Sequence, residues 1–264
     1  MPAPIQMLWV EGRLSPLERL SMASFIRCGH PVHLYIYGPV DGVPEGVTVL
    51  DGRTILPEGR ICRYGAAAGP GEGSLALFAN VFRYALLNRN GGIWSDCDIV
   101  CLKPLGDAIA ADYVIATEYR DRRRQIAIAN NCLIKAPAGS PFIAECNATA
   151  MQADMETAGW GELGPAMMTV LVRKHAIEKF LAPPWRFSPL GWWEFGRLID
   201  DVGIQWPDAS LTLHCFNEMW RRNGLDKHAR YGAQSPFERL KAQYLTGAEQ
   251  GGGDAGGVRP PRAS

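Results

Sequence analysis

The chain has 264 residues, of which 47% are hydrophobic and 20% are charged, so it can bury a core of its own as a folded globular protein. Its 27 basic residues balance its 27 acidic ones, which argues against a nucleic-acid partner, because that ligand calls for a basic surface. No stretch reaches the roughly 20 apolar residues of a transmembrane segment, and Met1–Val10 lacks the basic start of a secretory signal. The seven cysteines form no C-x-x-C pair and no zinc-type cluster. Together these features predict a cytoplasmic protein with reduced thiols.

The N-terminal part has the pattern of a strand, a helix and two further strands. Ile5–Val10 is a short apolar run typical of a buried strand. Ser15, Pro16 and Glu18 have the order of an N-cap, a first-turn proline and a capping-box glutamate. We therefore expect a helix over residues 16–27, then strands at 31–37 and 47–50. This order predicts a right-handed crossover and a largely parallel sheet, which belong to the α/β class.

A helix that ends at a double glycine occupies the middle of the chain. Gly65–Gly73 has the composition of a mobile loop. Apolar residues then recur at helical spacing over 75–86, and Gly91–Gly92 predicts the end of this helix. Asn80 and Arg83 lie on the side away from the apolar stripe, so they face either solvent or a site.

The C-terminal half continues the alternation of strands and helices. We expect strands at 113–117, 125–134 and 211–215, and helices at 141–151, 164–174 and 235–245. Arg120–Arg124 is a basic run that predicts a solvated loop, with contact to an anionic acceptor or lipid headgroup as the alternative. The glycine-rich end predicts one domain over residues 1–246 and a disordered tail over 247–264.

Asp96 and Asp98 are the strongest candidates for chemistry. They follow an apolar run that ends near Ser95, and at the end of a strand the i, i+2 spacing would place both carboxylates on one side of the chain. We expect Asp98 to be exposed in a cleft. Two anions so close repel each other, and a divalent cation that also holds a diphosphate would neutralise them. Taken alone, however, an Asp-x-Asp pair favours a polar turn.

Three further residues could belong to the same site. Trp9 ends the first predicted strand, where ligands bind in open α/β sheets, so it could stack on a base or belong to the core. His214 could complete a metal site begun by the two carboxylates, although a single histidine is more often structural. Trp220 could close over a ligand as part of a lid.

The order of these pieces resembles the sugar-binding region of the DXD-containing glycosyltransferases. The central match runs from Phe82-Arg83 through Gly91-Gly92 to Asp96-x-Asp98. The resemblance covers residues 5 to about 222, with Trp9-x-x-Gly12 near its start and Gly164-Pro165 and His214-x-x-Asn217-x-x-Trp220 near its end. The family includes bacterial capsule and lipopolysaccharide sugar transferases, α-1,4-glycosyltransferases and fungal initiating mannosyltransferases, with the glucosyltransferase domains of clostridial toxins as more distant relatives.

The resemblance implies a GT-A fold, in which a mixed, mainly parallel sheet flanked by helices holds a nucleotide sugar and a divalent metal, Mn²⁺ or Mg²⁺. It implies that Trp9 stacks on the donor base, that Asp96 contacts the ribose and sugar, and that Asp98 binds the metal. Asn80 stands where relatives usually have Asp, and an amide brings no charge to the sugar hydroxyls. The implied catalytic residues are Asp96, Asp98 and Arg83, and the implied metal ligands are Asp98, Asp96 and His214. The implied donor contacts are Trp9, Asn80, Arg83, Asp96, Asn131, Asn217 and Trp220.

The function that the resemblance implies is metal-dependent transfer of a hexose, with retention of configuration, from a nucleotide-diphosphate sugar to a glycan or glycolipid acceptor. A UDP-sugar is the favoured donor, and peripheral contact with a membrane is compatible with such an acceptor. One alternative is a sugar-binding or scaffold protein of glycan assembly that has lost catalysis, which Asn80 keeps open. The other is a phosphatase of the haloacid-dehalogenase type, with Asp200 and Asp201 as its second acidic pair.

Overall fold

The computed structural model describes residues 3–245 and 258–261 of the chain. Its main sheet has six strands in the order β5-β3-β1-β6-β9-β8. The strands of this sheet are β1 (Ile5–Leu8), β3 (Val32–Ile36), β5 (Val47–Asp51), β6 (Gly92–Ser95), β8 (Val114–Tyr119) and β9 (Ala127–Ala136). Neighbours from β5 to β6 run parallel, whereas β6, β9 and β8 are antiparallel. The predicted α/β class with a mixed, mainly parallel sheet is therefore confirmed.

Two small sheets complete the strands. One pairs β2 (Gly12–Arg13) with β4 (Val40–Asp41), and the other pairs β7 (Ile99–Cys101) with β10 (Thr212–His214) in antiparallel fashion. Val258 forms an antiparallel bridge with Val40, a contact that the prediction for the tail did not include. The remaining predicted tail, residues 247–257 and 262–264, lies outside the described residues, and the domain boundary at 246 stays a prediction.

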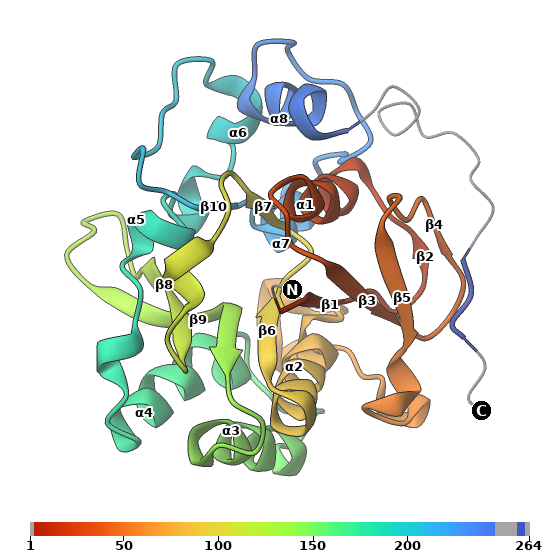
Figure 1. Cartoon of the computed structure of the whole chain (residues 1–264), viewed down its shortest axis with the longest axis vertical. Coiled ribbons are helices and arrows are strands. Elements are labelled where there is room, and N and C mark those ends of the chain that lie inside the picture. The colour runs from red at the N-terminus through yellow and green to blue at the C-terminus, as the bar shows by residue number, and fades with distance from the viewer. Residues whose placement is uncertain (1–2, 246–257, 262–264) are drawn as a thin grey trace.

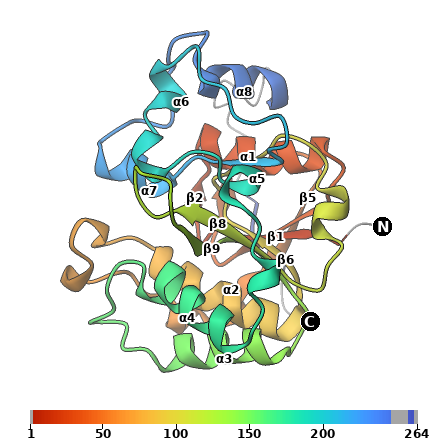
Figure 2. The same cartoon turned by 90° about the vertical axis from the view of Figure 1, so that its left-hand side faces the viewer.

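Helices cover both faces of the main sheet (Figures 1 and 2). α2 (Ala76–Asn90), α3 (Pro141–Gln152) and α4 (Met167–Lys174) lie on one face, and α1 (Pro16–Arg27) lies on the other, beneath α6 (Arg197–Asp200) and α8 (Pro236–Tyr244). The two remaining helices are the short α5 (Pro184–Phe187) and α7 (Asn217–Arg222). No helix within 3–245 or 258–261 is long and apolar enough to span a bilayer.

The start of α1 follows directly from the local sequence. The Ser15 side chain accepts the Leu17 backbone N–H, and the Glu18 carboxylate accepts the Ser15 backbone N–H at 2.7 Å. This reciprocal capping satisfies backbone donors that the first turn of a helix leaves free. The helix over 16–27 is therefore found with the predicted bounds.

The double glycine makes a sharp reversal between α2 and β6. Gly91 and Gly92 both have positive φ, at 63° and 90°, a region that glycine enters without steric cost. A Cβ on Gly91 would also lie only 2.6 Å from the backbone nitrogen of Ala138. The chain can therefore pass from the end of α2 into a strand that pairs with β1, which delivers Asp96 to the sheet edge.

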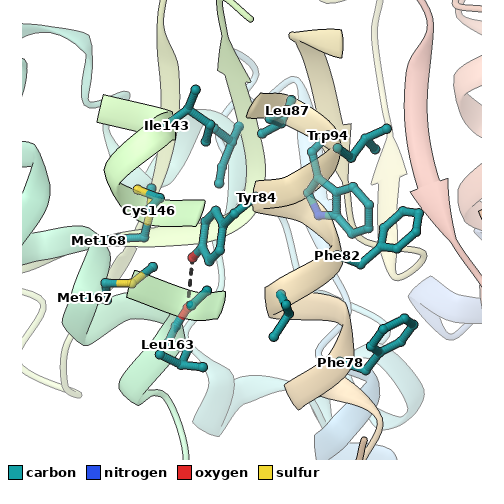
Figure 3. Close-up of a cluster of buried hydrophobic side chains, with 14 of the residues drawn as sticks. Phe78, Phe82, Tyr84, Leu87, Trp94, Ile143, Cys146, Leu163, Met167 and Met168 are labelled. Carbon is teal, nitrogen blue, oxygen red and sulfur yellow. Dashed lines mark hydrogen bonds between the residues drawn. The ribbon is translucent and has the colours of Figure 1, made fainter. Parts of the chain in front are cut away.

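An aromatic core between the sheet and α2 holds this arrangement in place. Phe78, Phe82 and Tyr84 on α2 pack with Trp94 of β6 and with side chains of α3 and α4 (Figure 3). The Tyr84 hydroxyl donates a hydrogen bond to the Leu163 carbonyl at 2.9 Å, drawn as the dashed line in Figure 3. The helix that carries Asn80 and Arg83 is therefore fixed against the strand that precedes Asp96.

Candidate active site

The candidate site lies where the order of the main sheet reverses. β1 continues to β3 on one side and pairs with β6 on the other, so the carboxyl ends of two parallel strands meet there. Such a switch point is where open α/β sheets bind ligands. Trp9 follows β1, and Asp96 follows β6. The Cys97 thiol donates to the Leu8 carbonyl at 3.3 Å, which joins the two strand ends directly.

The Asp96–Asp98 segment is a tight turn between β6 and β7. The Ile99 backbone N–H donates to the Asp96 carbonyl at 3.3 Å, and the Asp96 N–H donates to the Cys132 carbonyl at 2.8 Å. The polar turn that the Asp-x-Asp pair favours on its own is therefore found, and it lies at the carboxyl end of β6. The metal-binding interpretation stays a prediction.

Asp96 is held by two donors from the protein. One carboxylate oxygen accepts the Trp94 indole N–H at 2.8 Å and lies 2.9 Å from the Arg83 guanidinium. That guanidinium also lies 5.0 Å from the centre of the Trp94 ring. Burial raises the pKa of Asp96 against the opposing charge of Arg83, and the nearby Asp98 carboxylate adds to the rise. The ion pair thus orients Asp96 while part of its side chain, 26%, stays exposed.

Asp98 is bound by the C-terminal part of the chain. One of its carboxylate oxygens accepts the Asn217 backbone N–H at 2.7 Å and lies 3.4 Å from Nε2 of His214. The pairing of β10 with β7 sets His214 opposite Ile99, which explains this approach. Burial works to raise the pKa of Asp98, but His214 and the Asn217 N–H outweigh it and hold this pKa below its usual range. Burial likewise works to lower the pKa of His214, whereas the Asp98 carboxylate holds it well above its usual value.

The burial of Asp98 corrects the expectation of an exposed carboxylate in a cleft. Only 10% of its side chain is exposed, because the β7–β10 pair covers it. The covering strand comes from more than 100 residues further along the chain, so the local sequence around Asp98 gave no sign of it.

The donor atoms around Asp98 suit a divalent metal that also binds its substrate. Oδ1 of Asp98 and Nδ1 of His214 are both buried without a hydrogen-bond partner. A carboxylate oxygen and an imidazole nitrogen are both ligands for Mn²⁺. Within the described residues no group of three His, Cys, Asp or Glu side chains is arranged to hold a metal. The metal-ligand roles of Asp96, Asp98 and His214 that the resemblance implies therefore stay a prediction.

Asn80, Arg83 and Asn131 form one buried network beside Asp96. The Asn131 amide donates to Oδ1 of Asn80 at 2.8 Å and to the Tyr84 hydroxyl at 3.0 Å. Arg83 donates to the Asn131 carbonyl and, through Nε, to the Ala79 carbonyl at 3.1 Å. The two α2 residues thus face the site rather than solvent, which decides between the two alternatives left by the helical spacing.

The Gly164-Pro165 motif packs against this network. A Cβ on Gly164 would lie 3.4 Å from Oδ1 of Asn131. The motif belongs to η5 (Glu162–Ala166), a short π-helical turn that leads into α4, which begins at Met167 rather than at the predicted residue 164. The glycine therefore allows close approach of the backbone to an asparagine that the resemblance makes a sugar contact.

Trp220 does not lie as predicted. Its side chain is fully buried, its indole N–H donates to the Cys215 carbonyl at 2.9 Å, and its ring packs against Phe237 at 4.9 Å and Tyr231 at 5.8 Å. A lid residue would present a free face to the site, so this burial contradicts the prediction that Trp220 closes over a donor. Trp220 instead belongs to the hydrophobic core that α7 and α8 share.

Trp9 follows β1 and is half-buried, so its exposure does not decide between a base-stacking residue and a core residue. Its ring packs against the cluster beneath α1, and its indole nitrogen is buried without a hydrogen-bond partner. The role of Trp9 toward a base stays a prediction.

Two polar residues near the site escaped the sequence analysis. Lys227 donates a 2.7 Å hydrogen bond to Asn217. Glu118, near the end of β8, forms a hydrogen bond with Asn130 and interacts electrostatically with His214. Burial raises the pKa of Glu118, which His214 and Asn130 oppose. Neither residue carries a recognisable local motif, because tertiary packing alone brings them to Asp98 and His214.

The acidic pair invoked for a phosphatase is placed differently. Asp201 is bound by Arg197 at 2.8 Å and by the Gly203 N–H at 3.0 Å, and neither it nor Asp200 contacts Asp96 or Asp98. The structure therefore does not bring Asp200 or Asp201, the pair that this alternative needs, to the site.

Part of the chain matches a known protein family, and a longer part is similar to two curated proteins. Residues 74–116, which run from before α2 to within β8, match the family described as the glycosyltransferase sugar-binding region containing DXD motif. The chain is 23% identical over 190 residues to lactosylceramide 4-alpha-galactosyltransferase of Rattus norvegicus and 24% identical over 190 residues to that of Mus musculus. Each alignment covers 64% of this chain and 48% of the relative, so the chain spans about half the length of these curated relatives.

Two solved structures are also similar. The PaToxG glycosyltransferase has 13% sequence identity and a TM-score of 0.42, over 94% of this chain and 86% of that one. The glycosyltransferase GlyE of Streptococcus pneumoniae TIGR4 has 11% identity and a TM-score of 0.42, over 85% of this chain and 62% of that one.

Proposed function

We propose that this chain, whose residues 74–116 match the DXD-motif sugar-binding region family, is a metal-dependent glycosyltransferase with a GT-A fold. The observation that carries the proposal is the turn over Asp96–Asp98, which sets a buried, partnerless carboxylate oxygen beside His214 at the switch point of the sheet. A bound metal ion would give this oxygen the partner that it lacks. The donor is a nucleotide-diphosphate sugar, because its diphosphate supplies the further oxygens that the site leaves open.

In this proposal the two aspartates have different tasks. Asp98 and His214 hold Mn²⁺ or Mg²⁺, which when bound would offset the charge that develops on the departing diphosphate. Asp96, already oriented by Arg83 and Trp94, accepts hydrogen bonds from the ribose and sugar hydroxyls. Trp9 stacks on the base at the end of β1.

The neighbouring asparagines complete the sugar pocket. Asn131 is oriented by Asn80 and Tyr84, so one rotamer of each amide is fixed before a ligand arrives. Asn80 contributes hydrogen bonds to sugar hydroxyls without charge. Asn217 acts through its backbone N–H on Asp98.

A retaining reaction is part of the proposal. The matched motifs contain no carboxylate that stands out as a covalent nucleophile, so the departing phosphate is the candidate group to accept the acceptor's proton. The curated relatives are by name galactosyltransferases that act on lactosylceramide, which makes a hexose such as galactose, a UDP-sugar donor and a glycolipid or glycan acceptor the first candidates. A cytoplasmic location with peripheral membrane contact accompanies such an acceptor.

A thermal-shift panel tests the proposal. Nucleotide sugars are added with and without Mn²⁺, because a ligand that binds the folded state alone raises its stability. We expect at least one UDP- or GDP-sugar to raise the melting temperature only when Mn²⁺ is present, and to be slowly hydrolysed under the same conditions. Binding of glycan without binding or hydrolysis of any donor would instead support the catalytically inactive scaffold, for which the amide at Asn80 is the specific observation.

A further inference from the structure

Lys227 connects three parts of the candidate site. It lies in the segment between α7 and α8, and its ammonium donates to Oδ1 of Asn217 at 2.7 Å. The same ammonium forms an ion pair with Oε1 of Glu18 at 2.5 Å and lies 5.9 Å from the centre of the Trp9 ring. These contacts come from α7, from the first turn of α1 and from the end of β1.

The ammonium lies close to residues at both ends of the proposed donor site. On one side stands Trp9, which the proposed function assigns to the base. On the other side stands Asn217, whose backbone N–H binds the proposed metal ligand Asp98 at 2.7 Å. In a nucleotide sugar the diphosphate joins the nucleoside to the sugar and is the part that the proposed metal binds, so we expect it near an ammonium that neighbours both Trp9 and Asn217.

Lys227 can bind a further partner while it keeps its present ones, because its ammonium has three N–H donors and Glu18 and Asn217 take two of them. Glu18 is almost fully buried, with 1% of its side chain exposed, and its other oxygen is already fixed by the capping box at Ser15. The Lys227 side chain is 22% exposed and ends a flexible stem, and a lysine ammonium is a frequent point-charge partner of phosphate. The ion pair neutralises the buried Glu18 carboxylate, and the remaining N–H of the partly exposed ammonium can be donated to a neighbouring anion.

We propose that Lys227 binds the diphosphate of the donor, bridging the base-binding end of the site to its metal-binding end. The inference rests on the proposed function and deepens it, because it adds a specific cation for the leaving group. The competing explanation is a purely structural ion pair between Lys227 and Glu18. The two differ in one respect: only if Lys227 binds phosphate will its substitution weaken a nucleoside diphosphate more than the matching nucleoside.

Calorimetric titration of matched ligands tests this difference. UDP and uridine, and in parallel GDP and guanosine, are titrated in Mn²⁺ into the full chain and into Lys227→Gln, Lys227→Arg and Lys174→Gln. Lys174 serves as the control because it also pairs with a carboxylate, Glu145, on the helices α3 and α4. We expect Lys227→Gln to weaken the diphosphate by about 10- to 100-fold, the range for a lost charge-assisted hydrogen bond. We expect the nucleoside to change by less than about twofold, Lys227→Arg to recover part of the loss, and the control to bind like the wild type.

A second measurement does not depend on whether the variants fold. Lysines of the wild-type chain are acetylated at a limiting reagent concentration, and the modification of Lys227 is compared with that of Lys174 by mass spectrometry. Protection of Lys227 by the diphosphate but not by the nucleoside supports the proposal. Equal protection by both ligands, or unchanged diphosphate affinity in Lys227→Gln, overturns it while leaving the proposed function intact. If the wild-type chain binds neither diphosphate, both the inference and the proposed function fail.

Discussion

Removal of the Arg83 guanidinium is the perturbation whose cost can be worked out most fully. Arg83 is buried, lies 2.9 Å from Asp96, and donates to the carbonyls of Ala79 and Asn131. Substitution by Met keeps the packing of the stem but leaves the Asp96 carboxylate with only the Trp94 N–H. Breaking a fully buried ion pair costs about 3 to 5 kcal/mol. Because 26% of the Asp96 side chain is exposed, solvent screening reduces the expected cost to about 2 to 3 kcal/mol.

A double-mutant cycle measures the coupling energy between Arg83 and Asp96. Arg83→Met, Asp96→Asn and the double variant are unfolded in urea, and the free energy of unfolding is extrapolated to water. We expect a coupling energy of about 1 to 2 kcal/mol, because the neutral amide at 96 removes the unpaired charge that makes the single arginine variant costly. The loss of the hydrogen bond to the Asn131 carbonyl should persist in both arginine variants. Additive effects, with a coupling below about 0.5 kcal/mol, would refute the view that Arg83 is the partner that neutralises Asp96.

Three further predictions concern the base, the metal and the core. Trp9→Ala should weaken nucleotide binding by about 1 to 3 kcal/mol, the range for a lost base–aromatic stack, as measured by calorimetry; an unfolded variant would identify Trp9 as a core residue instead. Mn²⁺ affinity should rise with pH around neutrality, because the Asp98 carboxylate raises the pKa of His214 despite its burial and the metal must displace that proton. Titration in buffers of different ionisation enthalpy should show proton release, and a pH-independent affinity would exclude His214 as a ligand. Trp220→Ala should lower the free energy of unfolding by about 3 to 5 kcal/mol, as for other buried large-to-small changes. Near-normal stability together with lost donor binding would instead support the prediction that Trp220 closes over the donor.

The elements with strong local signals could be predicted from the sequence. The capping residues fixed α1 to its observed bounds, and the spacing of apolar residues with the double glycine located α2 and the strand after it. The same reasoning places Trp9 and Asp96 each at the end of a strand, whereas the pairing of those two strands is seen only in the structure. The motif match over residues 74–116 lies in this well-predicted part.

The contacts made by the last part of the chain could not be predicted in the same way. Asp98 is covered by β10, and Lys227 reaches Glu18 across 209 positions of sequence. Such contacts depend on tertiary packing rather than on periodicity or capping, so the burial of Asp98 and the place of Lys227 had no local signal. Trp220 shows the converse, since its place in a family-like motif suggested a lid although its surroundings make it a core residue.

Donor hydrolysis tests the central claim most directly. The wild-type chain and Asp98→Asn, which keeps the side-chain volume but removes the charge, are incubated with a panel of UDP- and GDP-sugars with and without Mn²⁺, and the released nucleoside diphosphate is measured. The account predicts that the wild type releases it from at least one donor only with Mn²⁺, and that Asp98→Asn releases none. Equal release by the variant, or no release from any donor by a folded wild type, would contradict the account.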